Sequence, residues 1–135
     1  MNFIDLIERN NFLKQIFKND IRTDKIKINR IELVSPSRLN FDIQIFEKPD
    51  FIPEKWGQWN VGFNTIVIEL TIHSLFEVII ENWQKNTSLV KLTYDKIGDK
   101  IELRVSDPTW NLSIIAQLIV YQKCSVFIDT NFNNI

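Results

Sequence analysis

The residues that most often carry catalysis are scarce in this chain. His73 is the only histidine and Cys124 is the only cysteine. A nucleophile needs an adjacent base, but His73 falls in a segment that we predict to be a turn. Cys124 lies among apolar strand residues, where a thiol acts as a small hydrophobic group. A zinc site needs a cluster of Cys and His, so we expect no catalytic residue, no metal and no cofactor.

Three carboxylates repeat along one predicted sheet face: Glu69, Glu77 and Glu81. Carboxylates that face one another raise each other's pKa and can form an acid–base pair or a metal site. No histidine lies near them in the sequence, however, and Val67 and Ile79 come between them. A solvated acidic face is the simpler interpretation. On such a face the glutamates are accessible to other proteins, and our hypothesis is that they face a binding partner.

Four tryptophans are the other distinctive side chains: Trp56, Trp59, Trp83 and Trp110. Trp56 and Trp59 flank a predicted strand entry, where they would plug the end of the sheet against an N-terminal helix. Exposed, they would instead be anchors of the kind enriched at interface hot spots. A third interpretation is that the tryptophans line a ligand cavity in a curved sheet. The sequence leaves open whether Trp56 and Trp59 are buried.

The most apolar stretch of the chain, residues 55–83, is predicted to form a hairpin. Apolar residues alternate with polar ones over 66–72 and again over 76–80, the period of a half-buried strand. A three-residue connection, residues 73–75, pairs Leu70 with Val78 and keeps all the alternating apolar positions on one buried face. The buried set then consists of Ile66, Ile68, Leu70, Ile72, Phe76, Val78 and Ile80.

The remaining patterns complete the expected fold. Residues 3–18 have helical spacing with a break at positions 10–11, and later segments alternate as strands. A bulge is expected at positions 29–30, a two-residue turn at 98–99 and a tight turn at 107–110. The fold class is α+β: an N-terminal helical segment packed on a curved antiparallel β-meander of six or seven strands.

Length and charge narrow the classes of function. A chain of 135 residues is expected to form one domain, residues 1–135. Residues 31–84 carry three Lys or Arg and eight Asp or Glu, a balance that argues against nucleic-acid binding and suits a basic protein partner. The apolar runs are too short to span a membrane. The lone cysteine fits a reducing cytoplasm.

Several segments together resemble the small α+β immunity proteins of bacterial polymorphic toxin systems. They are the helical NFLKQIF, the strand LNFDIQIFEKP, the loop KWGQW and the run VIELTIHSLFEVIIENW. The resemblance implies a cytoplasmic, non-enzymatic protein that binds and neutralises a cognate toxin domain. It implies a partner but no particular site, so Glu69, Glu77, Glu81, Trp56 and Trp59 remain the candidate partner-binding residues. The alternative is a small-molecule-binding β-domain with a tryptophan-lined pocket. The oligomeric state and the activity of the toxin are not determined by the sequence.

Overall fold

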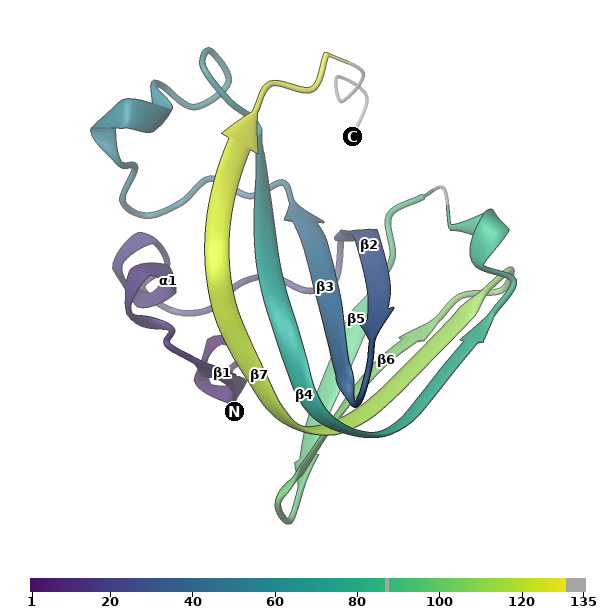
Figure 1. The fold of residues 1–135 in the computed structure, drawn as a ribbon. Helices are drawn as coiled ribbons and strands as arrows, with labels where there is room; N and C mark the ends of the chain where they lie inside the picture. The colour runs from purple at the N-terminus through teal and green to yellow at the C-terminus, as the bar shows by residue number, and fades with distance from the viewer. Residues whose placement is uncertain (87, 131–135) are drawn as a thin grey trace.

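A single curved sheet dominates the computed structural model, which describes residues 1–86 and 88–130. The described residues form seven strands in the order β2-β3-β4-β7-β6-β5, and β1 pairs with β7 off this path (Figure 1). β1 and β7 are parallel and all other neighbours are antiparallel. The strands are β1 (Ile7–Glu8), β2 (Lys27–Val34), β3 (Arg38–Ile45), β4 (Thr65–Glu81), β5 (Leu92–Ile97), β6 (Lys100–Ser106) and β7 (Asn111–Phe127).

Helices are a minor component of the described residues. The elements are η1 (Ile4–Leu6), α1 (Asn11–Ile16), η2 (Glu54–Trp56) and η3 (Trp83–Lys85), of which only α1 is an α-helix. The predicted break at positions 10–11 is present, and Leu13 and Ile16 of α1 are buried. The first half of the predicted helical segment is instead one 3-10 turn followed by β1. The helical part of the predicted fold was therefore overestimated, whereas the antiparallel sheet is confirmed.

The predicted hairpin at residues 66–80 is wrong, because β4 continues as one strand through residues 73–75. β4 pairs with β7 from Thr65 to Glu81, and with β3 only as far as His73. A three-residue connection and an uninterrupted strand leave the apolar positions with the same parity, so the alternation could not distinguish them. The chain also has no Gly, Pro or Asn at 73–75 to favour a reversal.

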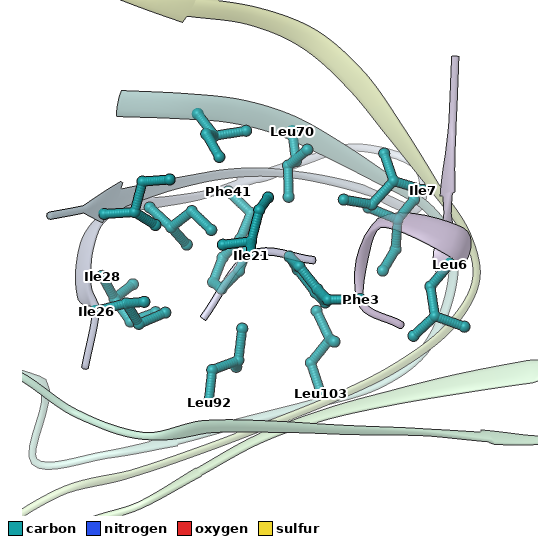
Figure 2. Packing of buried hydrophobic residues seen from close by; sticks show 14 of the residues in the cluster. Phe3, Leu6, Ile7, Ile21, Ile26, Ile28, Phe41, Leu70, Leu92 and Leu103 are labelled. Carbon is teal, nitrogen blue, oxygen red and sulfur yellow. The ribbon is translucent and has the colours of Figure 1, made fainter. Parts of the chain in front are cut away.

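The two long strands bend, so that the sheet wraps around its own core (Figure 1). β2, β3 and the first half of β4 form one wall, and β5, β6 and the second half of β4 form the other. A main-chain bridge between Ile26 and Val90 joins the outer edges of the two walls, with nitrogen-to-oxygen distances of 2.9 and 2.7 Å. Figure 2 shows Phe3 and Ile21 of the N-terminal segment between the two walls. This segment therefore fills the concave side, and the convex side faces solvent.

Three turns and bulges predicted from local sequence are confirmed. β2 slips by one residue against β3 between Ile28 and Arg30. β5 and β6 pair across Gly98-Asp99, with Leu92 opposite Val105 as expected, and Gly98 has a φ of +64°. The Asp107 N–H donates to the Trp110 carbonyl across the turn into β7, at 3.2 Å. Local turn chemistry determines these features, so a short window of sequence is sufficient to locate them.

Candidate functional site

Three β-bulges shape the convex face of the sheet. In a bulge, two residues of one strand oppose one residue of its partner, which re-aims a side chain. The extra residues are Asn29 in β2, Phe76 in β4 and Gln122 in β7. Asn29 accepts a hydrogen bond from Gln44 at 2.9 Å, whereas Phe76 and Gln122 line two separate hollows. The bulges thus add side chains to this face that a regular ladder would not place there.

The larger hollow, which we call the charged pocket, lies on the wall formed by β2, β3, β4 and β7. It has a volume of about 430 Å³, within the range of small-ligand sites. It contains three cationic side chains and one carboxylate, together with amide, hydroxyl and imidazole groups. Its lining residues are Arg30, Arg38, Asn40, Glu69, Leu70, Thr71, His73, Gln122 and Lys123.

A buried carboxylate lies beside the charged pocket. Asp42 is only 6% exposed, and its Oδ2 lies 2.8 Å from Arg30 Nε. That hydrogen bond raises the pKa of the Arg30 guanidinium above its usual value. Arg30 Nη1 also lies 3.3 Å from Glu32 Oε1, and Glu32 accepts a 2.5 Å hydrogen bond from Asn40. Arg30 is thus held by two carboxylates, which leaves Arg38 and Lys123 as the more available cations.

The other end of the charged pocket is organised around Thr71. Gln122 Nε2 donates to Thr71 Oγ1 at 2.8 Å, and His73 Nε2 lies 2.9 Å from the same oxygen. His73 therefore lies on β4 rather than in the predicted turn, next to Arg38 across the ladder. Arg38 has no ion pair among the described residues. This cluster can hydrogen-bond a polar or anionic group of a partner.

The second hollow, which we call the apolar groove, lies on the wall formed by β4, β5, β6 and β7. It has a volume of about 220 Å³ and is lined by Phe76, Glu77, Ile97, Lys100, Glu102 and Ile115. Phe76 is 52% exposed and Ile97 is 62% exposed. Lys100 Nζ lies 4.3 Å from the centre of the Phe76 ring, a cation–π distance. An apolar centre with charged neighbours is the usual composition of a protein interface.

The three predicted glutamates all lie on the convex face, but in different places. Glu69 lines the charged pocket, with its Oε2 3.6 Å from Lys123 Nζ. Glu77 lines the apolar groove, and Glu81 ends β4 opposite Asn111. Eight residues of strand separate Glu69 from Glu77, roughly 26 Å at 3.3 Å per residue. They form no common acidic cluster, because the strand continues where we expected it to reverse.

The tryptophans form two groups at opposite ends of β4. Trp56 is 8% exposed and packs edge-on against Phe12 and Phe63. Trp59 is half-buried against the other side of this group, with its ring centre 5.3 Å from that of Phe63. Trp83, after β4, packs edge-on against the buried Trp110. Trp56 and Trp59 thus plug one end of the sheet, and no single cavity can be lined by all four rings.

Sequence reasoning missed most of the residues that line the two hollows. Phe76 was expected in the core, but the alternation of β4 changes side near Ser74, which has a positive φ. Leu75 therefore packs against the core, and Phe76 faces outward. Ile80 of the same expected set is 37% exposed, because β4 forms the edge of the sheet there. Arg30 and Lys123 come from β2 and β7, and no local pattern relates them to Glu69. The one available signal was the predicted phase slip at 29–30, which shifts Arg30 relative to the apolar alternation.

Comparisons of this chain with protein-family models, curated proteins and solved structures find no match. Within the described residues, no helix has the length and apolar character needed to cross a membrane. In that part of the chain, no three His, Cys, Asp or Glu side chains are grouped so that they could hold a metal ion. The functional proposal rests on the convex face and on the charged pocket and the apolar groove described above.

Proposed function

We propose that this chain is a non-enzymatic immunity protein that binds and neutralises a cognate bacterial toxin domain in the cytoplasm, using the convex face of its sheet. The observation that carries the proposal is the apolar groove. Exposed apolar clusters on soluble proteins mark interaction sites, and exposed aromatic side chains are frequent binding hot spots. Phe76 is exposed and lines this groove, and the bulge places Glu77 on the same face beside it.

The charged pocket supplies the polar part of the same surface. Arg38, Lys123 and the His73–Thr71–Gln122 cluster offer hydrogen bonds to a partner, and Glu77 and Glu81 offer carboxylates to a basic one. Charge complementarity of this kind mainly sets specificity and association rate. The toxin as partner class rests on the resemblance to immunity proteins. The small-molecule alternative gains no support from the tryptophans, because they do not surround one cavity.

The proposal predicts that a toxin domain is encoded beside this chain's gene, and that domain is the reagent for the test. Expression of that domain alone should stop growth of a bacterial host, and co-expression of this chain should restore it. Purified chain and toxin should form a stable complex in titration calorimetry. Phe76→Asp should abolish both rescue and binding, because a carboxylate would be forced into the apolar centre of the interface.

Val61→Asp is the matched control for Phe76→Asp. Val61 is 73% exposed in the loop before β4, away from both hollows, so the same type of substitution should leave rescue and binding intact. Circular dichroism should show both variants folded. Absence of a complex between the wild-type chain and the toxin domain would refute the proposed function. Full binding by a folded Phe76→Asp chain would exclude the apolar groove as the contact.

A further inference from the structure

The second half of β4 is a free sheet edge. β3 pairs with β4 only as far as His73, and the last main-chain bond on that side runs from the Leu75 N–H to the Ser37 carbonyl, at 3.3 Å. From Phe76 to Glu81 the ladder described by the structure runs to β7 alone. Figure 1 shows this half of β4 at the rim of the wall that also contains β5 and β6, with no strand on its outer side. Six residues span about 20 Å, the usual length of a strand.

This edge has few of the usual protections against pairing. Sheet edges are normally blunted by Lys, Pro or a covering segment. Residues 76–81 contain neither Lys nor Pro. Ile79 is 44% exposed and Ile80 is 37% exposed. The bulge at Phe76 lies only at the start of this stretch, so Val78 to Glu81 remain a regular edge with three apolar residues and one carboxylate.

We propose that an extended segment of a protein partner, with alternating basic and apolar side chains, adds to this edge as a further strand of the sheet. The proposal deepens the proposed function and rests on it for the source of the segment. Residues opposite each other in a ladder lie on the same face. Glu77 and Glu81 lie on the convex face and Val78 and Ile80 on the concave face, so basic partner residues would meet the glutamates and apolar ones would extend the core.

Charge decides between such a segment and a second copy of this chain. Neither Glu77 nor Glu81 has an ion pair among the described residues, so both carboxylates are available to a cation. If two copies paired antiparallel about Ile79, each Glu77 would face the Glu81 of the other copy. Like charges directly opposite each other destabilise a ladder. A partner strand with basic residues opposite Glu77 and Glu81 forms ion pairs there, whereas a second copy places glutamate opposite glutamate.

The test uses two short peptides and the full chain labelled for NMR. One peptide alternates lysine and valine and the other alternates glutamate and valine, each titrated to millimolar concentration. The lysine peptide should give saturable shifts confined to the amides of residues 75–81, with at least tenfold slower hydrogen exchange there. The glutamate peptide should give none. The shared valines make the glutamate peptide the control for apolar binding alone.

A charge swap makes the result specific to the edge. The variant Glu77→Lys/Glu81→Lys should no longer bind the lysine peptide and should instead bind the glutamate peptide. Glu8→Lys/Glu54→Lys makes the same change in net charge at exposed positions remote from the edge, and it should behave like the wild-type chain. If the reversed variant fails to fold, Glu77→Gln/Glu81→Gln should weaken the lysine peptide at least tenfold.

Several results would overturn the inference. They are no shifts at millimolar lysine peptide, shifts centred elsewhere, or edge amides already protected by a dimer of the free chain. None of these measurements uses the toxin. If the chain binds the lysine peptide at residues 75–81 but fails to neutralise the toxin, this inference stands and the proposed function is refuted. If the variant with both edge glutamates changed to lysine neutralises the toxin as well as the wild-type chain does, only this inference is refuted.

Discussion

Ile115 of β7 faces two residues of β4, with Glu77 as its ladder partner and Phe76 as the extra residue of the bulge. This relationship determines the character of the convex face. Leu75, opposite the buried Ala116, packs against the core, so the regular alternation already directs Phe76 outward, and without the extra residue Glu77 would point into the core. With it, an aromatic ring and a carboxylate lie side by side in the apolar groove. The position of Phe76 follows from the ladder, and a local sequence pattern does not predict it.

Phe76 is expected to matter for binding and little for stability. Phe76→Ala should change the free energy of unfolding by less than about 0.5 kcal/mol, because the ring is already half exposed. Phe41→Ala, at a fully buried position, should cost about 3–5 kcal/mol. Urea denaturation compares the two variants directly. In calorimetry with the toxin domain, Phe76→Ala should weaken binding at least tenfold; an unchanged affinity would contradict this role.

Replacing Ser74 with glycine should stabilise the fold, because Ser74 has a φ of +56° in the middle of β4. This left-handed conformation costs most residues about 1–2 kcal/mol, and glycine adopts it freely. We expect Ser74→Gly to raise the free energy of unfolding by about 0.5 kcal/mol and Ser74→Val to lower it by about 1–2 kcal/mol. Thermal unfolding gives the order of the three chains. A glycine variant less stable than the valine variant would refute this explanation.

The parts of the fold that were predictable depend on contacts close in sequence. The alternation of residues 39–45, the slip at Asn29 and the turn at Gly98 are each specified within about ten residues. The continuation of β4 was not predictable in this way, because a hairpin with an odd number of connecting residues has the same parity. β7 decides the question: it pairs along the whole of β4, and each of its paired residues is 30 or more positions away from its partner in the sequence.

The candidate site was less predictable than the fold, for the same reason. Glu69 was identified as a surface residue, but its neighbours Arg30 and Lys123 come from strands far away in the sequence. These cations make the surroundings of Glu69 a mixed-charge pocket, although the segment that contains Glu69 is acidic overall. Charge summed along the chain therefore describes a strand and not the sheet face on which its side chains lie.

The ion pair between Arg30 and Asp42 should stabilise the sheet measurably. Removing one partner of a buried pair leaves an uncompensated charge, and Asp42 Oδ1 is already buried without a hydrogen-bond partner. Because the Arg30 side chain is 44% exposed, solvent screens part of the effect, and we expect Arg30→Ala to cost about 2 kcal/mol. Urea denaturation at pH 7 measures it.

The double variant Arg30→Ala/Asp42→Asn tests the origin of that loss. A neutral amide costs less to bury than an unpaired carboxylate, so it should recover more than half of the lost stability. The two substitutions are in contact and should not be additive. If the double variant is as unstable as the two single variants predict together, then the packing of the Arg30 side chain, and not its charge, stabilises this wall.

Cys124 should be slow to react and should make stability depend on pH above 9. Burial raises the pKa of its thiol to about 11, and the nearby Glu69 adds to the effect, against a hydrogen bond to Tyr121 that lowers it. The thiolate is the reactive form, so a shift of about two units should slow alkylation by iodoacetamide at pH 8 about 100-fold relative to the urea-unfolded chain. Equal rates in the two states would show that the thiol is neither buried nor shifted.

The same shift gives a definite sign for the pH dependence of folding. The folded chain holds the thiol proton more tightly than the unfolded chain does, so the stabilisation is fully present below pH 9 and is lost as the pH rises through about 11. The loss should amount to about 2 kcal/mol. Burial also raises the pKa of Tyr121, which adds a loss of the same sign at higher pH. Urea denaturation between pH 8 and 11 should show a fall in stability that is smaller in Cys124→Ala. A Cys124→Ala chain with the full wild-type slope would assign the pH dependence to other groups.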